Sequence, residues 1–169
     1  MNDAIDLDPS LDGPGRRHMV MHAAIDEPIS MYWGLPSNDP GIKKIALLQS
    51  ERARIDRPCL IIATEFGMQR EGGGAHYRAR LITDEPFFCI AGVWRPRGGH
   101  RDWPDSFAAL TVPAYPDLAP YKDRHVAVVH PDDWDDWMDQ TRDPLDILRP
   151  FPKNSFIVKG PPVQSSLAL

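Results

Sequence analysis

Proline is the residue that most constrains how this chain can fold. Eighteen prolines are spread through 169 residues, from the first ten positions to the last ten. Inside a helix a proline removes a hydrogen bond and clashes with the preceding turn, and in a sheet it is confined to edges and strand ends. The chain is therefore expected to consist of short elements joined by frequent turns, which excludes a bundle of long helices.

Apolar patterns of strand length predict most of the regular structure. Residues 59–66 (CLIIATEF) and 87–94 (FFCIAGVW) are nearly continuous apolar runs, which is typical of strands buried on both faces. Residues 76–83 alternate apolar and polar side chains, as a half-exposed strand does. Shorter strands are predicted at residues 18–24, 29–35, 106–112, 125–129 and 155–158.

Helices are predicted at three places, residues 42–54, 130–138 and 144–148. The first rests on the helical spacing of Ile42, Ile45 and Leu48. The second opens with a proline and aspartates, which suit a helix N-terminus, and it places Trp134 and Trp137 on one inward face. Together these elements predict an α+β fold that is mostly β, with short helices and long loops. Residues 1–17 are expected to be a flexible acidic leader, and residues 18–169 a single domain.

Charge is distributed unevenly along the chain. The net charge is −5, whereas proteins that hold nucleic acid over a broad surface are usually basic. Aspartates are concentrated in the first twelve residues and in residues 132–146, and arginines between positions 52 and 101 make the middle of the chain basic. Those arginines either surround a sheet as separate solvated side chains or gather on one basic face.

Two cysteines, Cys59 and Cys89, each lie inside an apolar run. They are predicted to be buried free thiols in a reducing compartment. Neither a CxxC nor an HExxH pattern occurs, so no metal or cofactor is expected. The N-terminus has no apolar signal segment, and no apolar stretch reaches the ~20 residues that cross a bilayer, which predicts a cytoplasmic protein without a membrane partner.

Six segments, in order, resemble landmarks of one protein family. They are WGLP at 33–36 (family WGLIP), RPCLIIA at 57–63 (RRCLIPA), EPFFCIAGVW at 85–94 (EPFAFAGLW), FAALT at 107–111 (FTILTT), DR at 123–124 (HDRMPV) and HPDDWDDW at 130–137 (PxDWxxWL). The segments span most of the chain, and by their order and spacing the chain resembles the SOS response-associated peptidase (SRAP) family.

The resemblance implies a fold and a chemistry. The fold is one mostly β domain with a mixed, partly barrel-like sheet. The family is linked to the DNA-damage (SOS) response and crosslinks to abasic sites in single-stranded DNA. The cysteine that follows the initiator methionine forms a thiazolidine with the ring-opened sugar, assisted by an asparagine, a glutamate and a histidine. The same residues are linked to removal of a short propeptide.

The residues of that chemistry are replaced in this sequence. Position 2 is Asn2 instead of cysteine, and no segment resembles the one that supplies the asparagine. Met68 stands at the glutamate position and Lys122 at the histidine position. A thiazolidine needs an amine beside the thiol, which an internal cysteine lacks. Neither thiazolidine formation nor autoproteolysis is therefore expected to carry over.

Three positions that contact DNA in the family are retained. By resemblance, Trp33 packs against a base, while Thr111 and Arg124 contact phosphate. Trp33 has an equally weighted alternative as a core tryptophan. The leading hypothesis is a degenerate member of the family that binds single-stranded DNA weakly at most.

Two other functions remain open. A protein-interaction module that keeps the fold without touching DNA is favoured by the net charge and by the acidic residues at 132–139. A lyase is the third hypothesis, because a lysine amine held neutral by burial and a nearby cation can form a Schiff base with an aldehyde. Lys122, beside Arg124, is its candidate catalytic residue, and a surface lysine in a loop is the alternative.

Overall fold

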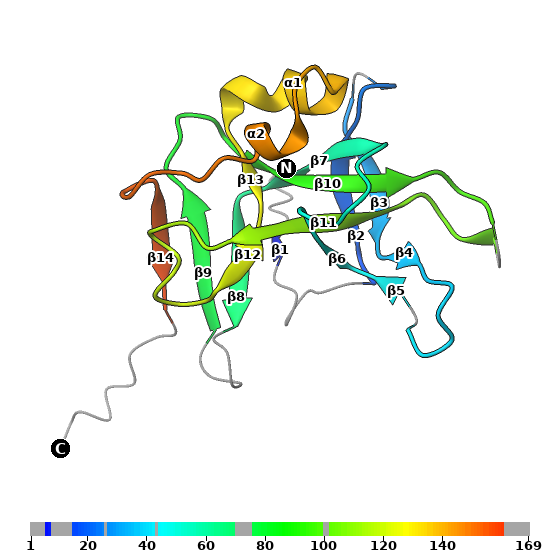
Figure 1. Cartoon of the computed structure of the whole chain (residues 1–169), viewed down its shortest axis with the longest axis horizontal. Helices are drawn as coiled ribbons and strands as arrows, with labels where there is room; N and C mark the ends of the chain where they lie inside the picture. The colour runs from blue at the N-terminus through cyan, green and yellow to red at the C-terminus, as the bar shows by residue number, and fades with distance from the viewer. Residues whose placement is uncertain are drawn as a thin grey trace.

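The structure is a computed structural model, which describes residues 6–7, 15–25, 27–42, 44–69, 76–99 and 102–160. Its strands form a barrel and a second, four-stranded sheet, and two short helices cover one end (Figure 1). The fold is α+β and mostly β, as the sequence predicts. None of the helices in the described ranges is long and apolar enough to span a bilayer.

Five strands close into a ring. Their order is β11–β3–β2–β7–β10, and β10 pairs back onto β11. The β11–β3 contact is parallel and the other four are antiparallel. These strands are β2 (Arg17–Met21), β3 (Ile29–Trp33), β7 (Pro58–Ala63), β10 (Phe88–Arg95) and β11 (Ser106–Pro113).

Strand β11 is long enough to change partners along both of its edges. One edge pairs with β10 at the Ser106 end and with β12 (Arg124–Val126) at the other end. The opposite edge pairs first with β3 and then with β6 (Leu47–Gln49). Strand β10 likewise pairs with β13 (Val128–Val129) beyond β11. As a result, β11 carries side chains to two separate ends of the barrel.

The second sheet has the order β1–β8–β9–β14. Its strands are β1 (Asp6–Leu7), β8 (Glu65–Gln69), β9 (His76–Leu81) and β14 (Phe156–Lys159). The predicted single strand at 59–66 is wrong in one respect, because the chain leaves the barrel at Thr64 and enters this sheet as β8. An unbroken apolar run cannot show where a chain passes from one sheet to another.

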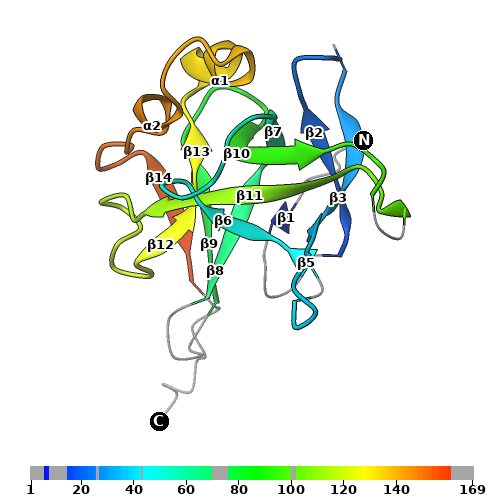
Figure 2. The ribbon, with the colours of Figure 1, turned by 45° about the vertical axis from the view of Figure 1, so that its right-hand side comes forward.

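The helical segment near the C-terminal part of the domain begins as the sequence predicts. A 3₁₀ turn, η2 (Pro131–Asp133), leads into α1 (Trp134–Asp139), and α2 (Pro144–Ile147) follows. Trp137 is buried and its Nε1 donates to the carbonyl oxygen of Cys59 at 2.8 Å, which anchors α1 to β7. Figure 2 shows both helices over the same end of the barrel, beside β13.

The helix predicted at residues 42–54 is wrong. The segment contains β5 (Lys44–Ile45), which pairs with β4 (Leu35–Pro36), and then β6. Strand β6 lies parallel to β11, which has an edge to fill at this point. Unpaired backbone groups are costly when buried, so the need to complete β11 outweighs the local helical spacing.

Two aromatic groups fill the interior. Within the barrel, Trp33 stacks on Phe107 with ring centroids 6.0 Å apart, and His18 meets both rings edge-on. Between the barrel and the second sheet lies a second group, consisting of Phe66, Tyr115, His125, Phe151 and Phe156. The packing of the second group joins the two sheets into one hydrophobic core.

The expected leader is described only in two pieces. Residues 6–7 pair in parallel with Glu65 and Phe66 of β8. Gly15 and Arg16 exchange backbone hydrogen bonds with Trp33, at 2.9 and 2.8 Å. Residues 1–5 and 8–14 lie outside the described residues.

Candidate nucleic-acid interface

Thr111 and Arg124 lie together at one end of β11. Strand β12 runs antiparallel to β11, with Arg124 opposite Pro113 and Val126 opposite Thr111. The Arg124 guanidinium reaches back along this ladder, and its Nη2 donates to the Thr111 carbonyl oxygen at 2.8 Å. Its Nε and Nη2 are also 3.4 and 3.3 Å from Thr111 Oγ1. The structure thus brings together the two residues that resemblance assigns to phosphate.

A third residue, Glu51, completes this cluster. Arg124 Nη1 and Nη2 donate to the two Glu51 carboxylate oxygens at 2.8 and 2.9 Å, a bidentate ion pair. Ser50 Oγ donates to Glu51 Oε1 at 2.6 Å. Hydrogen bonds from Arg124 and then Ser50 lower the pKa of Glu51 to about 2. The carboxylate therefore stays ionised throughout the physiological range and holds the guanidinium.

The sequence gives no local signal for Glu51. It stands 73 positions before Arg124, just after β6, and is brought to Arg124 because β6 and β12 flank the same part of β11. A phosphate uses the same fork of N–H donors that Glu51 now occupies. An incoming phosphate must therefore compete with this carboxylate or bind the remaining donors at the edge of the pair.

Lys122 lies in the turn just before β12. Its side chain is half-buried, and its backbone N–H donates to the Leu118 carbonyl oxygen at 3.2 Å. Within the described parts of the chain its amine makes no ion pair. The preceding residue, Tyr121, contacts the ring of Tyr77 in β9, with centroids 4.7 Å apart. Lys122 is thus two residues from Arg124 on the same turn.

Trp33 is separated from these residues. Its side chain is fully buried inside the barrel, and its Nε1 donates to the Ala46 carbonyl oxygen at 2.8 Å. Trp33 is paired with Phe107, four residues before Thr111 on β11, which corresponds to ~13 Å along a strand. In this conformation the indole is a core side chain, and no base can reach its faces.

The position where the resemblance places a glutamate is part of the core. Met68 is 2% exposed on β8, opposite Tyr77 of β9. Glu65, three residues earlier, instead forms an ion pair with Arg78 at 2.9 Å on the outer side of this sheet. This agrees with the odd spacing between the two positions, because neighbouring side chains of a strand alternate between its faces. Glu65 therefore does not take the place of the carboxylate that is absent at Met68.

His125 follows Arg124 but points into the core. Its Nε2 accepts a hydrogen bond from the Tyr115 backbone N–H at 3.0 Å, so this nitrogen carries no proton. Its Nδ1 is 2.8 Å from the Val126 carbonyl oxygen and must be the donor. Burial lowers the pKa of His125 to about 4, with smaller contributions from Arg124 and Lys122. His125 is a neutral structural histidine.

The two cysteines are free and buried, as the sequence predicts. Burial raises the pKa of each thiol, which keeps both protonated and unreactive near neutral pH. Among the residues that the structure describes, no group of three or more His, Cys, Asp or Glu side chains is placed to hold a metal ion. The chemistry of the candidate interface is therefore that of Arg124, Thr111, Glu51 and Lys122.

The arginines in the middle of the chain do not share one face. Arg78 pairs with Glu65, Arg54 with Asp56, and Arg80 is exposed on the second sheet. Arg70 and Arg101 lie outside the described residues. Three others, Arg57, Arg95 and Arg97, gather around one pocket at the far end of β11 from Arg124.

Known structures share this fold. A protein from Bordetella bronchiseptica aligns with a TM-score of 0.72 at 21% identity, over 88% of this chain and 85% of that one. One from Bacteroides thetaiotaomicron aligns with a TM-score of 0.67 at 20% identity, over 86% and 74%. A phage-related protein from Bordetella bronchiseptica gives 0.66 at 19%, over 89% and 80%. None of the curated proteins compared with the sequence matches it.

Comparison of the sequence with models of protein families identifies its family. The family described as SOS response associated peptidase (SRAP) matches residues 50–166, which is more than half of the chain. The matched range contains Met68, Thr111, Lys122 and Arg124, and Glu51 near its start. These observations establish that the chain belongs to the SRAP family.

Proposed function

We propose that this SRAP-family protein binds single-stranded DNA weakly through the phosphate backbone and does not form a thiazolidine crosslink. The observation that carries the proposal is the Thr111–Arg124 pair, whose guanidinium is held by the Thr111 carbonyl oxygen and Glu51. An arginine fixed in this way presents its remaining Nη1 N–H with little loss of side-chain entropy on binding. Contacts of this kind position a strand without reading its sequence.

The absence of thiazolidine chemistry follows from the residues at the family's reactive positions. Met68 offers no carboxylate, and Lys122 replaces the histidine. The two cysteines are buried, and each sits inside a strand where its own amine is part of a peptide bond. A thiazolidine requires a free amine and a thiol on neighbouring carbons, and neither cysteine provides that pair.

Weak affinity follows from charge. Glu51 already neutralises Arg124, and the chain carries a net charge of −5. Affinity for a strand depends mainly on the number of phosphates that cations neutralise. Because Glu51 competes with phosphate for Arg124, binding releases few counterions from the DNA strand, and the affinity stays low.

The decisive measurement is single-stranded DNA binding as a function of salt, for Glu51→Gln and Arg124→Gln beside the wild type. Glu51→Gln keeps the size of the side chain but removes the competing charge, so we expect about 3-fold tighter binding. Arg124→Gln should weaken binding about 3- to 10-fold and flatten the salt dependence. The matched control is Arg80→Gln, because Arg80 is an exposed arginine on the second sheet. This substitution should change neither the affinity for DNA nor its dependence on salt.

A non-catalytic protein-interaction module is the rival that this titration separates. If all four proteins bind DNA equally weakly, or with no salt dependence, the phosphate interface is disproved. The acidic segment formed by η2 and α1 would then be the surface to examine, since Asp132, Asp135 and Asp139 are exposed there.

A second candidate activity rests on Lys122, a half-buried residue that makes no ion pair with any described residue and lies two residues from Arg124. In this reaction the neutral amine adds to the aldehyde of an abasic site, water leaves, and an imine forms. Abstraction of the neighbouring proton then expels the 3′ phosphate by β-elimination, and water releases the lysine.

The test mixes the protein with a single-stranded oligonucleotide carrying one abasic site, with and without borohydride, and resolves products on a denaturing gel. An adduct that requires borohydride and disappears in Lys122→Ala supports the imine. Lys153→Ala, a lysine in the turn before β14, serves as the matched control. Neither adduct nor cleavage in the wild type would eliminate the lyase and leave the binding proposal unaffected.

A further inference from the structure

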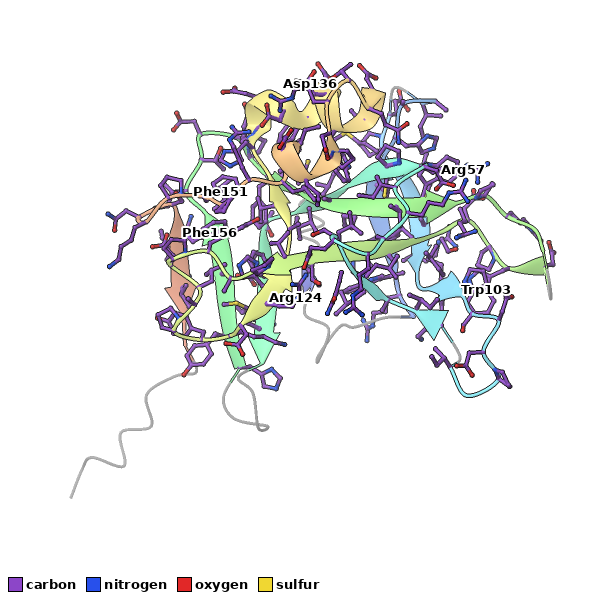
Figure 3. The ribbon with its side chains drawn as sticks, viewed as in Figure 1. Arg57, Trp103, Arg124, Asp136, Phe151 and Phe156 are labelled. Atoms are coloured by element: carbon purple, nitrogen blue, oxygen red, sulfur yellow. The ribbon has the colours of Figure 1, made fainter. Side chains whose placement is uncertain are left out.

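The Ser106 end of β11 carries a pocket that is separate from the interface described above. The pocket has a volume of about 330 Å³ and is lined by the side chains of Arg57, Arg95, Arg97, Trp103 and Ser106. Ser106 and Thr111 are five residues apart on β11, which corresponds to ~17 Å along an extended strand. Figure 3 shows Arg57 and Trp103 at the end of the barrel away from Arg124. No residue belongs to both sites.

Positive charge in this pocket is only partly neutralised. Arg97 pairs with Asp102, at 2.6 Å between Nη2 and Oδ2, and its backbone N–H donates to Asp105 Oδ1. Arg57 and Arg95 are exposed and form no ion pair with any residue in the described ranges. In contrast to Arg124, these two guanidinium groups donate to no other residue in the part of the chain that the structure describes.

Ser106 provides a second, independent observation. Its side chain is fully buried at the floor of the pocket, and its hydroxyl has no hydrogen-bond partner within the part of the chain that the structure describes. Ser106 stands directly opposite Arg95 in the β10–β11 ladder, so the two side chains lie on the same face. A buried hydroxyl without a partner is costly, and such a group calls for a specific explanation.

Residues 96–99 and Trp103, which lie between β10 and β11, form one wall of the pocket. Gly98 pairs with Trp103 in an isolated bridge, and Trp103 Nε1 donates to the Gly34 carbonyl oxygen at 2.9 Å. Gly98 and Gly99 have φ of 141° and 75°, which only glycine adopts readily, and the space beside each is open. The indole of Trp103 is partly exposed and forms an apolar side to the pocket.

The geometry points to a binding site for the phosphate group of a nucleotide-sized phosphate monoester. Arg57 and Arg95 supply charge and N–H donors to the phosphate oxygens, and the Ser106 hydroxyl, which lines the same pocket, donates one more hydrogen bond to them. The planar fork of N–H donors on a guanidinium group matches the spacing of two phosphate oxygens. It therefore favours phosphate over an anion of the same charge that lacks such a pair of oxygens. Ligand pockets in proteins have volumes from about 300 Å³ upward. The volume of this pocket, about 330 Å³, is therefore large enough for the rest of a mononucleotide beside Trp103.

Isothermal titration calorimetry with AMP tests this site, with adenosine as the uncharged comparison. We expect AMP to bind the wild type and adenosine to give no measurable heat. The double variant Arg57→Gln/Arg95→Gln should weaken AMP binding at least about 10-fold, since two charge-assisted contacts are lost. Arg80→Gln and Arg124→Gln should bind AMP as the wild type does.

Ser106→Ala separates a role in binding from a role in folding. Removal of a hydroxyl that has no partner should raise the melting temperature, yet weaken AMP binding about 3- to 10-fold. A purely structural serine would not produce these opposite changes. If Ser106→Ala binds AMP with unchanged affinity, the hydroxyl is not a ligand and the site as drawn is wrong.

Two competition titrations show whether the phosphate belongs to the end of a strand or to a free nucleotide. A 5′-phosphorylated oligonucleotide that displaces AMP, while its 5′-hydroxyl form does not, assigns the site to strand ends. If neither oligonucleotide displaces AMP, the ligand is a free nucleotide. Equal binding of AMP and adenosine, or no binding of AMP by the wild type, overturns the proposal. Because Arg124 is not involved, that result would leave the DNA interface standing.

Discussion

The two ends of β11 carry similar residue types in different electrostatic states. At the Thr111 end, Arg124 is bound on one side by the Thr111 carbonyl oxygen and on the other by Glu51. At the Ser106 end, Arg95 has no carboxylate partner among the described residues, and the hydroxyl beneath it has no partner either. The end that resemblance marks as functional is internally satisfied, whereas the unmarked end is not. A family position identifies which residue is retained, but its neighbours decide whether that residue is free to bind.

The largest predicted difference between the two ends is in their response to acid. His125, next to Arg124, is neutral in the fold, with its pKa lowered by burial to about 4 from an ordinary value near 6.5. Between these values the unfolded chain binds a proton that the folded chain does not, so the free energy of unfolding falls as pH drops from 6.5 to 4. The loss should be about 3 kcal/mol, on the order of 1.4 kcal/mol for each pKa unit.

Urea unfolding at pH values from 7 to 4 measures this slope. The His125→Gln variant should be less stable at pH 7, but its free energy of unfolding should change much less between pH 7 and pH 4. His22, stacked on Trp94 near the Ser106 end, provides the comparison, and His22→Gln should retain most of the slope. An unchanged slope in His125→Gln would contradict the assignment of acid sensitivity to the Thr111 end.

Removing one arginine at each end should give the next largest contrast. Arg124→Gln breaks the bidentate pair with Glu51 and the bonds to Thr111, and it should lower the free energy of unfolding by about 1 kcal/mol, because the pair is partly exposed. Arg95→Gln removes a charge with no partner and should change stability by less than about 0.5 kcal/mol. Chemical denaturation of the two variants at one pH suffices, and equal losses would remove the distinction between satisfied and free arginines.

The smallest predicted effects are the changes in the free energy of unfolding when either hydroxyl of β11 is removed, and these two changes have opposite signs. Thr111→Val removes an acceptor for long hydrogen bonds from Arg124 and should cost about 0.5 kcal/mol. Ser106→Ala removes a buried hydroxyl without a partner and should gain about 0.5 to 1 kcal/mol. Thermal unfolding of both variants against the wild type should therefore show shifts in opposite directions. A loss in Ser106→Ala would mean that its hydroxyl has a partner in solution.

Local sequence patterns determined much of the fold. Alternating and continuous apolar runs identified β9, β10 and β11 because the spacing of side chains along a strand is a property of the strand itself. Proline and aspartate at positions 131–133 and 143–144 marked the starts of the helical segments for the same reason, since capping depends on neighbouring residues. The burial of both cysteines followed from the apolar runs that contain them.

Tertiary structure decided what depended on distant partners. Residues 47–49 became a strand because an edge of β11 required hydrogen bonds there. Trp33 turned into the barrel to stack on Phe107, and Glu51 met Arg124 across 73 positions of sequence. Hydrogen bonding across a sheet and the pairing of charges join residues that no local spacing relates, so the sequence alone could name Arg124 and Thr111 but could not show which arginines of this protein remain free.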